Sequence, residues 1–425
     1  MKSQIHFPPH LYLLCSAAVI VAFMVWVLAS GADGHTIWQS GRAHLGGTLA
    51  VLALLFVLFL RSLPEQPVLT LKTVILGMAL LAMPFLAAEP LTTSDVFAYG
   101  YYGRLVTVHH QNPFTIASTT EINDPYLTLT NADKPYKTTY GPFWISLSAA
   151  VTSVAKDNVA LAIAAFRLLN ILALIGVVLG LWRLCSWDAS GRWLVAAVAW
   201  NPLVLFETVQ NVHNDIIMTA LVVAALVAYD KKKDWAVLPI LTIGSLIKYL
   251  PALLIPLAVI AILTRGSWRG ALRSLVLGCA ISAALTVAAF LPYWNGVTTF
   301  VGLFRLQGFW ALPFFHPLGI LALLFRTAGV SQFAAEAQAR DIGVAVVVMT
   351  LVVLGIVLAV RKLKFATAVA FVFAAMVLCG VTYFQPWYLL WLLPLAPFLP
   401  RRWAQLTLAI GTVVPLATYV AFASS

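Results

Sequence analysis

One carboxylate stands out in the segment "LTTSDVFAYGYYGRLVTVHHQNPF", which follows an apolar run ending near Ala88. The segment is rich in aromatic and polar side chains, and Asp95 is its only acidic residue. A carboxylate at the end of an apolar segment is costly unless it is paired or used. It is therefore a candidate general base, able to take a proton from a hydroxyl nucleophile. The alternative is helix capping, which the residues "TTSD" before an apolar stripe also favour.

A second polar cluster, "HND", precedes an apolar run and comprises His213, Asn214 and Asp215. Capping by Asn214 and a favourable charge from Asp215 at a helix start explain two of the three residues. His213 is left unexplained, so the cluster is a candidate to hydrogen-bond sugar hydroxyls or to support Asp95. One His and one Asp two positions apart form a weak metal-ligand set, and no second acidic residue adjoins Asp95. The sequence therefore predicts no metal site.

Cationic side chains supply candidate anion contacts. Lys248 interrupts the apolar stretch "TIGSLIKYLPALLIP", and an ammonium group in such surroundings can meet a phosphate. The alternative is a lysine whose amine reaches the membrane surface while its stem stays in apolar surroundings. Arg104, Arg305 and His316 are further candidates for phosphate contact.

Aromatic side chains cluster near these polar residues. Tyr140 lies in "TTYGPFW", Tyr99 lies just after Asp95, and Gln385, Trp387 and Tyr388 lie in "QPWYLLWLLP". Their rings can stack on a sugar or a prenyl chain, or can form the aromatic belt of a membrane protein. They are candidate substrate contacts.

The composition identifies the protein class. Of 425 residues, 62% are hydrophobic and only 10% are charged, whereas soluble domains carry about 25% charged residues. The net charge of +11 comes from short basic clusters between apolar runs, as the positive-inside rule predicts, and not from a basic stripe that would track nucleic acid. The four cysteines lie far apart and are expected to be packing residues. The chain is therefore expected to be an all-α, polytopic membrane protein.

The lengths of the apolar segments predict about 13 crossings, with several segments tilted, broken or partly inserted because they are short or carry Pro or Gly. The first, Leu11 to Ala29, is expected to be an uncleaved helix and not a signal peptide, since it is long for an h-region. Between Tyr140 and Arg192 two apolar segments occur where an odd number is needed, so one of them is expected not to cross.

The basic clusters orient the chain, because Lys and Arg favour cytoplasmic loops. Clusters at 231–233, 265–273 and 361–364 are expected to be cytoplasmic. Helices running away from them then carry Asp95, "HND", Lys248 and "QPWY" to the external side. Four polar clusters, far apart in the sequence, are thus predicted to converge on one membrane face.

Two long external loops are predicted, at about 89–140 and 292–340. Residues 95–111 show an amphipathic helical pattern, with Val96, Tyr99, Gly103 and Val106 on one stripe, which is typical of an interfacial helix. The stretch "TTFVGLFRLQGFW" in the second loop is another candidate interfacial helix. No soluble domain is predicted, so the whole chain, 1–425, is expected to be a single membrane domain.

Taken as an ordered set, the motifs resemble those of GT-C superfold glycosyltransferases, most closely the polyprenol-phosphate-mannose-dependent mannosyltransferases that build lipomannan backbones. The motifs are "SDVFAYGYYGRL…NPF", "YGPFW", "NPLVLFETVQNVHNDIIM", "KYLP" and "PWYLLWLLP". They agree in order and spacing over roughly residues 90–400. Three hydrophobic segments precede Asp95, which fits the lipomannan-type subgroup.

The resemblance implies an inverting hexosyltransferase of the bacterial plasma membrane with Asp95 as the external, periplasmic base. Its partners would be a polyprenyl-phosphate sugar donor, a glycan or glycolipid acceptor and membrane lipids. No cofactor is expected, although a divalent metal stays open. The alternatives are a transporter or flippase of lipid-linked sugars, which would place polar residues through the membrane midplane, and a structural membrane subunit. Neither explains why the polar residues gather at one face.

Overall fold

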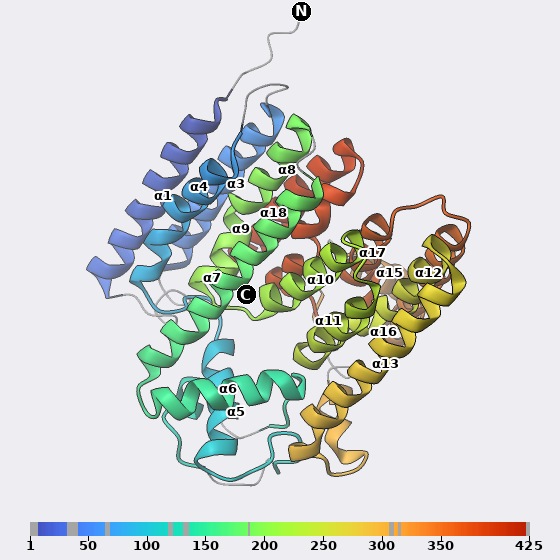
Figure 1. Cartoon of the computed structure of the whole chain (residues 1–425). Coiled ribbons are helices and arrows are strands. Elements are labelled where there is room, and N and C mark those ends of the chain that lie inside the picture. Colours follow the sequence, from blue (N-terminus) through green and yellow to red (C-terminus); the bar gives the residue numbers. More distant parts are fainter. Residues whose placement is uncertain are drawn as a thin grey trace, which may run out of the picture. The chain divides into compact units, whose positions relative to one another are not determined.

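The computed structural model describes residues 7–31, 41–63, 69–117, 122–130, 136–185, 188–305, 310–312 and 316–421. Within these ranges all regular elements are helices (Figure 1), and the extended pairing is limited to isolated bridges such as Ala311 with Tyr383. The predicted all-α class is therefore confirmed. All four cysteines are free. Cys185 is buried as the expected packing role requires, whereas Cys279 is exposed and does not have that role.

Five helices in the described part of the chain are long and apolar enough to cross a membrane. A sixth span results if the bent pair Ala189–Ala199 and Pro202–Gln210 is counted as one. Seven further apolar helices have 10–17 residues, which is shorter than the roughly 20 residues of an ordinary crossing. The helices fit a multi-pass membrane protein, but the predicted number of about 13 crossings is not confirmed.

The chain divides into two compact units, and the first consists of Met1–Val96, Ile163–Ala220 and Leu389–Ser425. Its helices are α1 (Pro9–Ser30), α3 (Arg42–Arg61), α4 (Leu71–Ala82), α8 (Ala189–Ala199), α9 (Pro202–Leu205), α18 (Arg401–Ala421) and most of α7 (Val159–Cys185). Helix α3 packs on α1 and α18, and α4 packs on α8 (Figure 1). Trp200, which follows α8, links α4 and α1. Its indole donates to Val74 O of α4 at 2.9 Å, and its backbone carbonyl accepts from the Tyr12 hydroxyl of α1 at 2.6 Å.

A break between α8 and α9 shapes the first unit. Pro202 has no N–H and disfavours helical backbone at the preceding residue, so α8 ends at Ala199. The Asn201 side chain then caps α9 by accepting from the N–H groups of Leu203 and Val204, and the two helical pieces meet at 42°. A π-helical turn, Phe206–Gln210, follows α9. Such turns widen a helix and are frequent at functional sites.

The second unit consists of Phe97–Ala162 and Leu221–Tyr388. Its helices are most of α5 (Asp95–Thr107), α6 (Pro142–Ala155), the greater part of α10 (Asp215–Asp230), α11 (Asp234–Ile247), α12 (Ile255–Arg265), α13 (Trp268–Phe290), α14 (Val301–Arg305), α15 (Pro317–Thr327), α16 (Gln332–Ala359) and α17 (Phe365–Ala375). Helix α11 packs on α13 and α6, and α16 packs on α12, α15 and α17. Because α5, α7 and α10 run from one unit into the other, the division leaves the single-domain prediction untested.

Helix α5 differs from the predicted interfacial helix. It ends at Thr107, and the side chains of Tyr101, Tyr102 and Leu105 are as buried as that of Tyr99 on the predicted stripe. The prediction of an amphipathic surface helix is therefore wrong for α5, because protein covers it on nearly every side. Gly103 permits this packing, since a Cβ there would lie 2.4 Å from Ser148 O of α6.

Of the two apolar segments between Tyr140 and Arg192, one was predicted not to cross the membrane. The lengths of α6 and α7 indicate which one. Helix α6 has 14 residues and is about 21 Å long at about 1.5 Å per residue, whereas a bilayer core is about 30 Å thick. Helix α7 has 27 residues and is long enough. Helix α6 is thus the segment that falls short of a full crossing.

The second predicted external loop, 292–340, is partly helical. Helix α15 lies within it, and α16 begins at Gln332 instead of near 341. Both are apolar helices. Helix α15 has a clear start, since Pro317 occupies its first turn, where its missing N–H costs nothing. In the candidate interfacial stretch only short helical pieces, Thr298–Phe300 and Val301–Arg305, are described. Residues 306–309 and the side chain of Arg305 lie outside the described part.

Candidate active site

Asp95 is the first residue of α5, and its side chain is 29% exposed. The Thr93 hydroxyl accepts the Asp95 N–H at 3.1 Å, so Thr93 contributes an acceptor that the start of the helix needs. The carboxylate itself is turned toward His213. A partly exposed carboxylate beside an imidazole has the accessibility that a general base requires.

His213 is fully buried and lies between two carboxylates. Its Nδ1 lies 3.4 Å from Asp95 Oδ2, and its Nε2 lies 3.5 Å from Glu207 Oε2. An imidazole in this position can carry positive charge between two acidic groups, an arrangement that low-dielectric surroundings strengthen. The structure therefore brings together Asp95 and His213, which the sequence predicted, and adds Glu207.

Glu207 lies in the π-helical turn and has no exposed surface. The Tyr419 hydroxyl of α18 donates to one of its oxygens, and the Asn211 amide donates to the other at 2.9 Å. Asn211 in turn donates to the Thr92 hydroxyl at 2.7 Å. These contacts hold the segment before Asp95 and the segment before His213 in one hydrogen-bonded network.

The backbone between Glu207 and His213 is strained. Val212 has φ of +61°, a conformation that a β-branched residue rarely adopts and that costs about 1–3 kcal/mol. Two buried side chains of α7 offset this cost by donating to the local carbonyl groups. Arg167 donates to Val209 O at 2.8 Å, and Asn170 donates to His213 O at 3.0 Å. Strain that surrounding contacts maintain is typical of functional sites.

Arg167 also holds the segment that leads to Asp95. Its guanidinium donates to Ala88 O at 2.8 Å and to Leu86 O at 3.3 Å. A planar guanidinium with five donors can serve carbonyl groups from two segments at once. Arg167 therefore fixes the segments carrying Asp95 and His213 relative to each other.

Asp215 and Asn214 lie at the start of α10, as the capping alternative expects. The Trp391 indole, in the "PWYLLWLLP" motif, donates a hydrogen bond to Asp215. Nearby, the Thr219 hydroxyl donates to Leu390 O at 2.9 Å. This motif thus supports the "HND" cluster through Trp391, which the sequence analysis did not single out.

A second group of predicted site residues gathers in the second unit, around Tyr140. Its ring packs edge-on against Tyr99 at a centroid distance of 5.2 Å. Lys248 Nζ lies 5.8 Å from the Tyr140 ring centroid and 5.7 Å from that of Tyr388, and Trp387 packs edge-on against Tyr388. Two aromatic faces thus hold the ammonium group, an arrangement that stabilises a cation.

Gly141 explains why Tyr140 and Lys248 lie together. Its N–H donates to Ile247 O at 2.9 Å, and a Cβ at this position would lie 2.1 Å from Leu246 O. Only glycine allows so close a backbone approach. The two groups of predicted site residues lie in different units, so their convergence on one membrane face stays a prediction.

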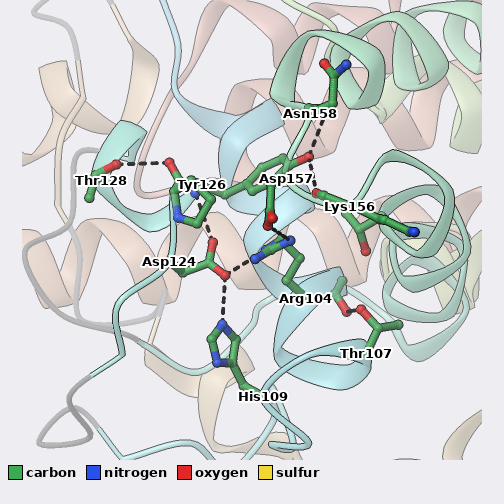
Figure 2. A network of polar contacts seen from close by, with 12 residues as sticks. Arg104, Thr107, His109, Asp124, Tyr126, Thr128, Lys156, Asp157 and Asn158 are labelled. Carbon is green, nitrogen blue, oxygen red and sulfur yellow. Dashed lines mark hydrogen bonds and ion pairs between the residues drawn. The ribbon is translucent and has the colours of Figure 1, made fainter.

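Arg104, a predicted phosphate contact, takes part in an ion-pair network (Figure 2), in which Arg104 and Asp124 are buried and Asp157 is exposed. Its Nε lies 2.7 Å from Asp124 Oδ2, and its Nη1 lies 2.8 Å from Asp157. His109 Nε2 also donates to Asp124 Oδ2 at 2.7 Å, and the Tyr126 N–H donates to Oδ1 at 2.9 Å. These contacts favour a structural role, in which Arg104 anchors the segment 122–130 to α5.

The network changes the acidity of its members. Burial alone would raise the pKa of Asp124, but hydrogen bonds from Arg104, His109 and the Tyr126 backbone outweigh it and lower the pKa below its ordinary value. Burial also disfavours the charged form of Arg104, yet its carboxylate partners raise its pKa above the ordinary value. Arg104 and Asp124 are thus both charged at neutral pH.

Replacement of Asp124 by Asn should destabilise the protein by about 2–4 kcal/mol at pH 7, because Arg104 loses its buried partner. The folded pKa of Asp124 lies below the unfolded value of about 3.9. Its contribution is therefore present above about pH 4 and is lost as the pH falls through the folded pKa. Thermal unfolding in detergent at several pH values measures the difference, and a gap between variant and wild type that does not shrink in acid contradicts this account.

His316 has a structural place in the fold. It caps α15, with Nδ1 accepting from the Leu318 N–H at 3.3 Å and Nε2 donating to Val377 O at 3.0 Å. Both ring nitrogens thus form hydrogen bonds with backbone groups.

Gln385 is partly buried, and its backbone carbonyl accepts from the Tyr388 N–H at 3.0 Å. Substrate roles for His316, Gln385 and Arg104 stay predictions.

Glu207 is the main site residue that the sequence analysis missed. It interrupts the apolar run "NPLVLFETVQ", and an ionisable residue in such a run is a functional candidate by default. That signal could have identified it. Tyr419 and Trp391 carry no comparable signal, since aromatic residues are ordinary in apolar helices. Among the described residues no group of three His, Cys, Asp or Glu side chains is placed to hold a metal ion.

Comparison with known proteins gives sequence relatives but no structural one. The chain is 24% identical to alpha-(1->6)-mannopyranosyltransferase A of Corynebacterium glutamicum over 183 residues, which cover 42% of this chain and 36% of the relative. It is 26% identical to the protein of the same name from Mycobacterium tuberculosis over 186 residues, covering 41% and 34%. The chain thus spans about a third of the length of the curated relatives it matches. No solved structure matches.

A family model matches a larger part of the chain. The model describes the N-terminal domain of alpha-(1->6)-mannopyranosyltransferases and matches residues 12–264, which include Asp95, Glu207 and the "HND" cluster. The match confirms the resemblance to GT-C mannosyltransferases of the lipomannan type. Because it extends over more than half of the sequence, the chain belongs to the alpha-(1->6)-mannopyranosyltransferase family.

Proposed function

We propose that this protein transfers a mannosyl residue from a polyprenyl-phosphate donor to a glycan or glycolipid acceptor at the external membrane face. The observation that carries the proposal is the partly exposed Asp95 carboxylate, 3.4 Å from His213 in the part of the chain that the family model matches. The apolar helices suit a lipid-linked donor, and the relatives named above are alpha-(1->6)-mannopyranosyltransferases.

In the proposed reaction Asp95 takes the proton of the acceptor hydroxyl as its oxygen attacks the anomeric carbon. The new C–O bond forms as the bond between that carbon and the phosphate oxygen breaks, so the configuration inverts. The prenyl phosphate leaves with the bonding electrons. Its developing charge is best stabilised by a cation already in place, and Lys248 has that role in the proposal.

Replacement of Lys248 by Gln should lower kcat/KM for the prenyl-phosphate donor about 10- to 100-fold, since hydrogen bonds to charged groups contribute about 1.5–3 kcal/mol. Steady-state kinetics with a polyprenyl-phosphate mannose measures this. Lys231→Gln, at an exposed position, is the matched control and should leave the kinetics unchanged. Equal kinetics for the Lys248 variant and wild type would remove Lys248 from the phosphate site.

We also expect transfer to proceed without a cofactor, because the sugar-phosphate bond of the donor is itself the activated bond. The rate should persist after extensive treatment with a chelator. A loss that Mg²⁺ or Mn²⁺ reverses would instead assign a divalent cation to the phosphate.

The direct test incubates the purified protein in detergent or nanodiscs with polyprenyl-phosphate mannose and a mannoside acceptor. The expected product is an inverted mannoside, identified by NMR of its anomeric proton. No transfer with any polyprenyl-phosphate sugar in a panel would refute the proposal. Movement of the intact donor across vesicles without glycoside formation would support a transporter or flippase.

A further inference from the structure

The proposed transfer gives no role to Glu207, the buried carboxylate behind His213. It has no exposed surface and lies in the π-helical turn that ends the bent helix pair. An acidic group in such a position is expensive to bury. The fold nevertheless provides two donors for it, the Tyr419 hydroxyl and the Asn211 amide. So specific an environment indicates that the carboxylate is used.

The imidazole of His213 connects this carboxylate with Asp95. The Nε2 atom lies 3.5 Å from Glu207, and the Nδ1 atom lies 3.4 Å from Asp95. Glu207 is inaccessible, whereas Asp95 is 29% exposed. Of the two carboxylates, Asp95 is therefore the one placed to meet a substrate. Glu207 can act on Asp95 through His213, and it also holds the segment before Asp95 through Asn211 and Thr92.

We infer that Glu207 is a positioning residue that orients His213, so that Asp95 and His213 share the proton taken from the acceptor. With Nε2–H directed to Glu207, the Nδ1 atom faces Asp95. The O–H bond of the acceptor breaks, its proton reaches Asp95 Oδ, and the Nδ1 atom takes a share of it. The partly exposed Asp95 returns the proton to water after the product leaves. This inference rests on the proposed function.

Other charged groups also face the cluster. Asp215 at the start of α10 and Tyr419 of α18 interact electrostatically with Glu207. Arg167 of α7 donates to the carbonyl groups of Val209 and Gln210 in the same turn. In this inference Glu207 is ionised, because both of its oxygens accept hydrogen bonds. Replacement of Glu207 by Gln then removes one negative charge and leaves these groups in place.

The charge of Glu207 has a measurable consequence. A negative charge beside Asp95 and His213 increases the proton affinity of the pair, whichever of the two carries the proton. Its removal should move the acid limb of the kcat profile to lower pH by about one unit or more. The weaker base should also lower kcat about 10-fold at neutral pH.

The first test compares kcat against pH for wild type, Glu207→Gln, Glu207→Asp and Glu89→Gln. The Glu207→Asp variant keeps the charge and should keep the acid limb near that of wild type. Glu89 is an exposed carboxylate of the same unit, so Glu89→Gln is the matched control and should behave as wild type. A Glu207→Gln variant that loses kcat equally at every pH would make Glu207 merely structural and overturn the inference.

A second measurement needs no substrate, so it separates this inference from the proposed function. Histidine labelled with ¹³C gives ring signals, and the His213 signal is identified by its loss in His213→Gln. Its titration midpoint should fall in Glu207→Gln and stay unchanged in Glu89→Gln. An unchanged midpoint in Glu207→Gln overturns the coupling. A lowered midpoint in a protein that transfers no sugar supports the coupling and refutes the proposed function.

Discussion

The Asp95→Asn variant should lose about 1,000-fold in kcat for sugar transfer while it keeps its affinity for the donor. General-base catalysis contributes about 100- to 10,000-fold, and an amide of the same shape cannot take the acceptor proton. The KM for the donor should change little, because the substitution preserves size. Single-turnover transfer measured by product NMR or a radiolabelled sugar gives the rate, and equilibrium binding of the donor gives the affinity.

A matched control separates loss of the base from loss of the fold. Asp188 caps α8 by accepting from the Gly191 N–H, and Asn caps helices about equally well. Asp188→Asn should therefore keep both activity and stability. Since the Asp95 side chain is partly exposed, Asp95→Asn should also unfold near the wild-type temperature. Undiminished transfer by a folded Asp95→Asn protein would remove Asp95 from the role of base.

Replacement of Arg167 by Met should destabilise the protein by about 3–5 kcal/mol and lower kcat by at least about 100-fold. The guanidinium donates to carbonyl groups on both sides of the site, at Ala88 and Val209. Without it, buried carbonyl groups lose their donors, at about 1–3 kcal/mol each. The strained turn at Val212 would then relax, and a displacement of about 1 Å is enough to cost 100-fold in rate.

Arg167→Lys and Arg183→Met complete this experiment. Arg167→Lys keeps the charge, but an ammonium group cannot donate to both segments as the planar guanidinium does. Compared with Arg167→Met, it should therefore recover more of the stability than of the kcat. Arg183 is exposed in the last turn of the same helix, and Arg183→Met should leave both quantities unchanged. Unfolding in detergent, followed by tryptophan fluorescence, measures stability. Wild-type kcat in a folded Arg167→Met protein would show that Arg167 does not position the site.

The helical class could be read from the sequence because hydrophobicity and helix-start signals act locally. A chain with 62% hydrophobic residues cannot cover a water-facing surface, and in a bilayer its backbone hydrogen bonds must be satisfied within helices. The bend at Asn201–Pro202 follows from the same local rules. The number of crossings could not be predicted as well from the sequence, because several apolar segments form helices that are too short to span a membrane.

The environment of α5 could not be read from its sequence. Its stripe of Val96, Tyr99 and Gly103 indicated one buried face, but Tyr101, Tyr102 and Leu105 are buried as well. Tyrosine suits a membrane interface and a protein core equally well, so its presence did not distinguish the two. The neighbours that cover the helix include residues of α6, which lies beyond a long loop.

Arg104 illustrates the same limit for charge. The sequence placed an arginine where a phosphate contact was plausible, but the partner that holds it, Asp124, comes from a separate stretch of the loop. An ion pair depends on distances of a few ångströms. Such distances between remote residues are set by packing and not by spacing along the chain.

By itself, the sequence determined that the protein is a helical membrane protein, and it predicted that Asp95 and the "HND" cluster carry its polar chemistry. Composition, apolar periodicity and short motifs are local properties, so they can be recognised in the sequence without knowledge of the fold. Only the tertiary structure decided that His213 stands between Asp95 and Glu207 and that Arg167 holds the segments on both sides. The physical reason is that these side chains come from segments that are far apart in the sequence, and only the packing of the helices brings these segments within hydrogen-bonding distance of one another.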